Sequence, residues 1–178
     1  ALSIGGYYDR NDGFFTNSFN GKKADKEESV GARLGLEWMI SPQFKAIYNF
    51  SFDYSEQGAF PYGLYNPETK ETAAVSINDS STYNRRMIGN QLRLEYKSNQ
   101  FTLSSTTGYR HLKDNMNMDQ DFSPLSIFTL NQKQKQNAFS QEIALKSNQP
   151  TNYQWSVGLY GFYDDLHTDG PVTFKEDG

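Results

Sequence analysis

The residues with the clearest potential for chemistry are the two histidines of this chain of 178 residues, His111 and His167. His167 stands in YDDLHTDG beside Asp164, Asp165 and Asp169, whose carboxylates could help to bind a cation. The alternative is a polar loop with no bound ion. Hydrolytic enzymes need a nucleophile and an oriented base, and the sequence contains no recognisable pair of this kind. We therefore predict a protein that is not an enzyme, with a polar loop around His167.

A second candidate is the run DNMNMDQD, residues 114–121, in which oxygen-bearing side chains recur at every second position. Calcium-binding loops begin in this way, but they carry Gly at the sixth position and Glu at the twelfth. Here those positions hold Gln120 and Ser126. The alternative is an extended strand with one polar face. The chain contains no cysteine, so a thiolate metal site is excluded, and we predict neither a metal site nor a cofactor.

The elements that must position these residues are strands. The stretch VGARLGLEWMI is apolar at each even position from Val30 to Ile40, and small or charged at the odd positions up to Glu37. Successive strand side chains leave opposite faces, so a period of two predicts a strand. Six other segments alternate similarly, and the seven together predict an all-β, antiparallel up-and-down meander. The predicted strands are 1–10, 30–40, 44–55, 87–97, 101–110, 138–146 and 153–163.

The mean hydropathy of -0.77 and the absence of a long apolar run exclude a membrane helix, which needs about 20 apolar residues. They do not exclude a transmembrane barrel, in which only alternate residues of each strand touch lipid. Acids outnumber Lys plus Arg by 21 to 17, which argues against a nucleic-acid partner. No charged segment followed by an apolar one opens the chain, so we expect a mature chain or a piece of a longer one.

The predicted connections alternate between short and long. The short ones are SPQ (41–43), KSNQ (97–100) and NQPTN (148–152), and the long ones are 11–29, 56–84 and 114–137. Outer-membrane barrels have short periplasmic turns and long extracellular loops. The pattern therefore predicts part of a transmembrane β-barrel. The alternative is a soluble β-sandwich, whose strands also alternate.

Aromatic residues stand where the two interfacial belts of a barrel would lie. One predicted belt flanks the short turns and contains Trp38, Phe44, Tyr96, Phe101, Tyr153 and Trp155. The other lies at the far strand ends and contains Tyr8, Tyr54, Tyr109 and Tyr163. The apolar side of the strands would then face lipid and the polar side a wet lumen.

Two further sets of residues are candidate functional positions. The predicted lumen-facing polar residues are Arg33, Glu37, Lys45, Asp53, Arg93, Glu95, Arg110 and Glu142, whose mixed charges suggest cross-strand pairs. The predicted ligand-binding residues are the loop aromatics Phe14, Phe15, Phe60, Tyr62 and Tyr65. Such rings stack on chelates and sugars, although they could equally fold the loops on themselves.

Several stretches resemble the barrel of TonB-dependent outer-membrane receptors of the siderophore-receptor type. YYDRNDGFFTN, GKKADKEES and GARLGLEWMIS are similar to an early barrel hairpin, and FTLSSTTGYRHLKDNMNMDQDFSP to a later strand and loop. AFSQEIALKS with YQWSVGLYGFYDD resembles another hairpin of that family. The family also has an N-terminal plug domain, for which this sequence shows no pattern. The resemblance therefore implies that residues 1–178 are a partial receptor barrel domain without the plug.

The resemblance also implies a function and a location. We expect an outer-membrane receptor segment of a Gram-negative bacterium, for energy-dependent uptake of a ferric siderophore or similar chelate. The expected partners are outer-membrane lipid, the ferric chelate, and the plug domain and TonB energy-coupling complex of the full-length receptor. Two alternatives are a small stand-alone outer-membrane barrel serving as adhesin or pore, and a soluble β-sandwich binding module.

Overall fold

The computed structural model describes residues 1–58, 60–149 and 153–178, which form an all-β protein. In this part of the chain the main sheet consists of seven long strands, as the alternation predicted, and the short strand β10 (Val172–Phe174). The long strands are β1 (Leu2–Asn11), β2 (Glu27–Met39), β3 (Phe44–Gly58), β6 (Thr82–Lys97), β7 (Phe101–Asp119), β8 (Phe128–Ser147) and β9 (Ser156–Asp169). The other short strands are β4 (Tyr65–Asn66) and β5 (Glu71–Thr72). No described helix is long and apolar enough to cross a membrane.

The long strands pair in chain order as β1-β2-β3-β6-β7-β8, and β9 pairs with β8. All these pairs are antiparallel, so the predicted up-and-down meander is confirmed. β10 pairs with Phe128–Leu130 of β8, beyond the last pair between β8 and β9. The chain between β9 and β10 contains Gly170 and Pro171, so the two strands form one interrupted edge. Among the described residues β1 pairs only with β2, and the sheet is not closed.

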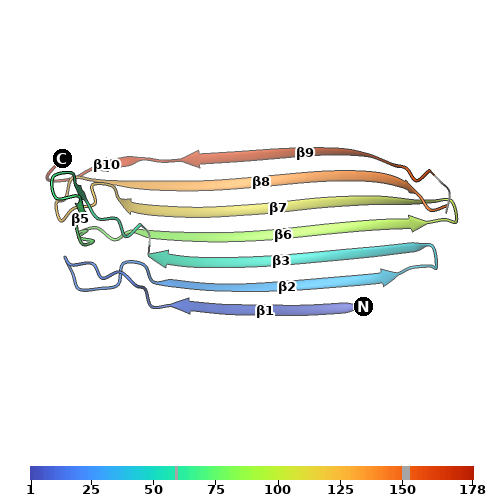
Figure 1. The fold of residues 1–178 in the computed structure, drawn as a ribbon, viewed down its shortest axis with the longest axis horizontal. Coiled ribbons are helices and arrows are strands. Elements are labelled where there is room, and N and C mark those ends of the chain that lie inside the picture. Colours follow the sequence, from blue (N-terminus) through green and yellow to red (C-terminus); the bar gives the residue numbers. More distant parts are fainter. Residues whose placement is uncertain (59, 150–152) are drawn as a thin grey trace.

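The connections separate by length at the two ends of the sheet (Figure 1). The tight turns at 41–43 and 98–100 lie at one end, together with the N-terminus. The third predicted tight turn, 148–152, lies partly outside the described residues. The long connections and the C-terminus lie at the opposite end, which we call the loop end. The antiparallel pairing explains this separation, because every second connection returns to the same end.

The strands extend further toward the loop end than predicted. β7 continues to Asp119 and β8 begins at Phe128, so most of the predicted 114–137 connection is paired strand. Residues 114–119 thus adopt the strand that was the alternative to a calcium loop. The prediction of a loop around His167 was wrong, because this residue lies in β9. Backbone hydrogen bonding continues the ladder where the apolar alternation has ended.

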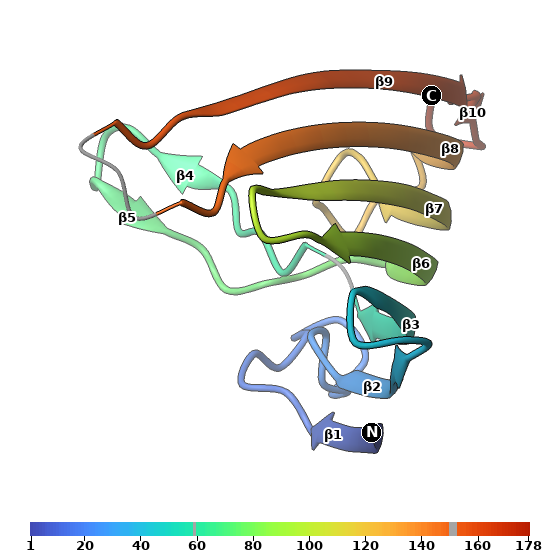
Figure 2. The ribbon, with the colours of Figure 1, turned by 90° about the vertical axis from the view of Figure 1, so that its right-hand side faces the viewer.

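The main sheet is a single layer when viewed along its strands (Figure 2). Val75 and Ile77, between β3 and β6, are the buried hydrophobic side chains of the described residues. A sandwich would bury residues such as Leu34, Phe50 and Leu94 between two sheets. These three side chains are only half-buried, and Leu36 is 45% exposed. The second sheet, β4 with β5, has only two residues in each strand, so the sandwich interpretation does not fit the structure.

Candidate functional site

Strand register sorts the side chains of the sheet onto two chemically different faces. Leu34 lies opposite Phe50 in β3, and the next row pairs Arg33 with Ser51. We call the face that carries Leu34 and Phe50 the apolar face, and the face that carries Arg33 the polar face. The register places all eight predicted lumen-facing residues on the polar face. The structure therefore brings this predicted set together on one surface.

The apolar face carries aromatic residues at two levels, as in the predicted belts. Phe44 lies opposite Tyr96 near the tight turns, and Tyr109 lies opposite Phe139 further along the sheet. Along β7 the two levels are eight residues apart (101 to 109), which is about 26 Å at ~3.3 Å per residue. This matches the roughly 25 Å height of the lipid-facing band of a barrel.

Between these levels the apolar face of the described strands carries no Asp, Glu, Lys, Arg or His. The polar side chains that do lie there bond to one another. The Tyr48 hydroxyl donates to Asn90 Oδ1 at 2.7 Å, and the Thr107 hydroxyl donates to Gln141 Oε1 at 2.6 Å. A polar group in an apolar medium needs such a partner. This face is therefore suited to hydrocarbon over its whole width.

The polar face holds a hollow of about 640 Å³ that reaches from β1 to β9. Gly35, Gly89 and Gly108 form much of its floor. A Cβ atom at any of the three would collide with a serine hydroxyl of the adjacent strand. The floor is thus bare backbone with small hydroxyl groups, which leaves room for another chain segment or a solute.

A polar network ties the first three strands together on this face. One guanidinium nitrogen of Arg33 lies 2.9 Å from Asp53 Oδ1, and another donates to the Phe52 carbonyl at 3.1 Å. The Tyr7 hydroxyl donates to the same carboxylate oxygen at 3.0 Å. The Tyr7 ring covers Gly31, where a Cβ would collide with it. The glycine therefore allows the ring of β1 to reach over β2 to β3.

The other predicted charged residues pair less uniformly. Lys45 Nζ of β3 lies 3.7 Å from Glu37 Oε1 of the neighbouring strand β2. Arg93 instead pairs with Glu95 on its own strand, at 3.0 Å, so the expectation of cross-strand pairing was wrong there. Arg110 donates to Gln136 Oε1 at 3.5 Å, and Gln136 donates to Asp164 at 2.7 Å. These contacts link β7, β8 and β9 by amide bridges rather than by ion pairs.

Sequence reasoning missed two aromatic side chains on the polar face. Tyr160 and Phe162 of β9 lie opposite Glu142 and Ser140, and both line the large hollow. Their ring centroids are 6.2 Å apart. Continuing the alternation of Gln154 through residues 160 and 162 would have found them. β9 thus carries aromatic residues on both faces.

At the loop end, the connection between β1 and β2 docks on the connection between β3 and β6. The buried Asn17 donates its amide N–H to the Ile77 carbonyl at 2.7 Å and accepts from the Ile77 N–H at 3.1 Å. The Ser18 N–H and hydroxyl donate to the Val75 carbonyl at 2.8 and 2.9 Å. The two buried hydrophobic residues therefore lie in segments that these hydrogen bonds fix.

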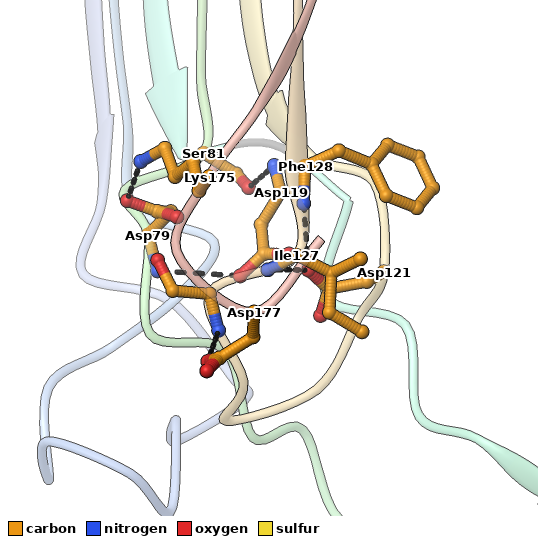
Figure 3. A network of polar contacts seen from close by, with 9 residues as sticks. Asp79, Ser81, Asp119, Asp121, Ile127, Phe128, Lys175 and Asp177 are labelled. Carbon is orange, nitrogen blue, oxygen red and sulfur yellow. Dashed lines mark hydrogen bonds and ion pairs between the residues drawn. The ribbon is translucent and has the colours of Figure 1, made fainter.

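A network of carboxylates joins the C-terminal segment to the other connections (Figure 3). Lys175 Nζ lies 2.6 Å from Asp79 Oδ1, and the Asp79 N–H donates to the buried carboxylate of Asp119 at 3.2 Å. Asp177 accepts from the Ser126 N–H at 2.8 Å. Burial opposes ionisation of Asp121, but donors from residues 123, 127 and 128 outweigh it and lower the pKa of this carboxyl. The network holds the loop end together through charge-assisted hydrogen bonds.

The five predicted ligand-binding aromatics do not lie in one place. Phe14, Phe60 and Tyr62 line a second hollow, of about 320 Å³, at the loop end. Phe15 and Tyr65 are exposed and do not line it. Within the residues that the structure describes, no group of three or more His, Asp or Glu side chains is arranged to hold a metal ion.

The two histidines lie on the same face of the sheet, His111 in β7 and His167 in β9. His111 Nδ1 lies 2.8 Å from Asn137 Oδ1 on the same face as Tyr109. His167 Nε2 lies 3.4 Å from Asp169 Oδ2, and both side chains are exposed. Neither contact pairs the imidazole with a hydroxyl or thiol nucleophile.

Together, the meander, its apolar face and its hollowed polar face define a barrel-like sheet. A solved structure that is similar to it is the ferric yersiniabactin uptake receptor FyuA from Yersinia pestis. The TM-score is 0.76 and the sequence identity 13% over 97% of this chain. The chain spans 27% of the length of that receptor, so the likeness concerns the fold of one part of it. No protein-family model matches the sequence. No curated protein matches it either.

Proposed function

We propose that this chain is a segment of the β-barrel of an outer-membrane receptor in a Gram-negative bacterium. The observation that carries the proposal is the apolar face, which is free of charge over about 26 Å between two aromatic levels. A charged side chain at the middle of the bilayer costs about 2–4 kcal/mol on such a face. If this side of the sheet faced water, the absence of charged side chains between the aromatic levels would bring no gain in stability. The apolar face therefore contacts outer-membrane lipid.

The polar face is then the aqueous interior of the barrel. Its eight predicted charged residues and the hollow above Gly35, Gly89 and Gly108 face that interior. The two open edges, β1 and β9, pair with further strands of a longer protein, since an unpaired edge in a membrane leaves backbone groups without partners. A plug domain of the same protein occupies the interior and contacts the polar face.

The cargo is a ferric siderophore or a similar chelate, which the receptor takes up with energy from the TonB complex. Support comes from the fold similarity to a ferric yersiniabactin uptake receptor and from the aromatic residues at the loop end. The ligand binds first at that end, and rearrangement of the plug then opens a passage along the polar face. No covalent chemistry is required.

Growth of a deletion strain on defined sources of iron, haem, cobalamin and glycans tests this proposal. We expect the strain to lose growth on one ferric chelate while retaining growth on abundant soluble iron. Uptake of that chelate labelled with radioactive iron should return on complementation and stop with a protonophore. Wild-type uptake of every source by the deletion strain would contradict the proposed transport function.

A further inference from the structure

The hollow of about 320 Å³ at the loop end is separate from the large hollow of the polar face. Its floor is the last row of the first three strands, in which Asn11 lies opposite Glu27 and Glu27 opposite Gln57. Phe14 and Asp25, from the connection between β1 and β2, line one side, and Phe60 and Tyr62 line the other. The site is thus formed where two connections meet above the strand ends.

Two carboxylates line this hollow, and they differ in how they are bound. The Asp25 carboxylate accepts from the Phe14 N–H at 2.9 and 3.0 Å and from the Phe15 N–H at 2.9 Å. Burial opposes its ionisation, but these donors outweigh burial and lower the pKa of the Asp25 carboxyl. This group therefore stays charged and fixes the loop that carries Phe14.

The Glu27 carboxylate is the uncompensated charge of the hollow. Its side chain is half-buried, and in the described part of the chain it has neither a hydrogen bond nor an ion pair. Lys23 is the cation that interacts with Asp25, but its Nζ donates to the Phe14 carbonyl at 3.1 Å and does not line the hollow. A half-buried carboxylate without a partner favours a positively charged guest.

The aromatic wall of the hollow is held in a fixed shape. The Phe60 and Tyr62 rings are stacked at 6.0 Å and 25°, and Tyr62 packs edge-on against Phe122 at 5.2 Å and 88°. Phe60 and Phe122 have φ angles of 60° and 52°, in the left-handed region that bulky residues rarely adopt. Strained residues of this kind concentrate at ligand clamps. Phe60 and Tyr62 are therefore packed against neighbouring rings, whereas Phe14 is 77% exposed.

We infer that this hollow binds a cationic group, such as a substituted ammonium, on a ligand that approaches the loop end. The aromatic rings of Phe14, Phe60 and Tyr62 line the hollow and can attract a cation through their quadrupoles, and the Glu27 carboxylate supplies the opposite charge. This inference deepens the proposed function, because it assigns a positive charge to the part of the cargo that is recognised first. It rests on that proposal only for the identity of the ligand as cargo, since binding itself requires no transport.

A matched pair of small probes tests the inference on the purified protein in detergent. The probes are choline and 3,3-dimethyl-1-butanol, which have the same shape but differ by one positive charge. Binding is measured by saturation-transfer NMR and equilibrium dialysis. We expect choline to bind about tenfold more tightly than the neutral alcohol, as an attraction of this kind between a cation, aromatic rings and a carboxylate would give.

Substitutions separate the contribution of the carboxylate from that of the rings. Glu27→Gln keeps the shape and should weaken choline about tenfold while leaving the alcohol unchanged. Glu28→Gln is the control, since Glu28 lies on the opposite face of β2 and pairs with Arg10 at 3.5 Å. Tyr62→Leu should weaken both probes, and choline more strongly.

The outcomes distinguish the two proposals. Equal binding of both probes, binding of neither, or equal losses from Glu27→Gln and Glu28→Gln would overturn the cation site whatever the uptake assays show. If the cation preference holds while the deletion strain takes up every chelate normally, the site stands and the proposed transport function fails.

Discussion

Leu92 and Gln91 are adjacent in β6 and point to opposite faces of the sheet, which makes them a matched test of the environment of each face. Leu92 lies on the apolar face, between the two aromatic levels, and is 40% exposed to the space around the sheet. Gln91 lies on the polar face and lines the large hollow. The same substitution, to Arg, can therefore be placed in both environments on one strand.

The expected magnitudes differ because the proposed function places the two faces in different solvents. An Arg near the bilayer midplane costs about 2–4 kcal/mol, so Leu92→Arg should raise the unfolding equilibrium constant by roughly thirty- to several-hundredfold. An Arg on a solvated face usually changes stability by less than about 0.5 kcal/mol. Gln91→Arg should therefore be close to wild type, apart from losing the 3.3 Å contact of Gln91 with Asn49.

Urea titration of the protein folded into phosphatidylcholine vesicles measures both changes, with tryptophan fluorescence and gel mobility as readouts. Leu92→Ala serves as a control for lost contacts, since it removes the side chain without adding a charge. If Leu92→Arg and Gln91→Arg have equal effects in vesicles, the assignment of the apolar face to lipid is refuted.

Three further changes test other parts of the structure. The folded pKa of Asp25 lies below its ordinary value of 3.8. The stabilisation that the ionised Asp25 carboxylate gives to the loop is therefore complete above that pH and is lost as the pH falls through the folded pKa. Hydrogen exchange of the loop amides, corrected for intrinsic rates, should rise below about pH 3.8, and Asp25→Asn should remove this dependence. Asn17→Ala should destabilise the loop docking by about 1–3 kcal/mol, because it leaves buried backbone groups of Ile77 without partners; unchanged exchange of the Ile77 amide would contradict this. Gly31→Val should cost about 1–3 kcal/mol by colliding with the Tyr7 ring, and Tyr7→Ala should restore part of it in urea titrations of the double variant.

The sequence predicted the strands and their pairing partners because alternation specifies both a period and a face. The stretch from Val30 to Trp38 shows this most clearly, since each apolar residue lies on one face in the observed register. Residues 114–119 of β7 adopt the extended strand that was the alternative to a calcium loop. The prediction was wrong at His167 of β9, where pairing continues beyond the predicted strand end. There the backbone hydrogen bonds of a neighbouring strand, not the side chains, determine the conformation.

The candidate sites were predictable only in part. Polar residues such as Arg33 and Asp53 could be assigned to one face, because face follows from the period. Their partners could not, since the contact of Tyr7 with Asp53 depends on the missing side chain at Gly31. The placement of Phe14 and Phe60 around one hollow depends on how two connections fold over the strand ends, and no local pattern encodes it.

The position of Val75 and Ile77 affects the order in which parts of the protein unfold. In the proposed membrane barrel the strands depend on surrounding lipid, whereas the loop end has a small buried interior of its own, fixed by Asn17 and Ser18. The strands and the loop end should therefore lose structure under different conditions. Withdrawing lipid or detergent should destabilise the strands first, while protonation of Asp25 and Asp121 in acid should first weaken the connections at the loop end.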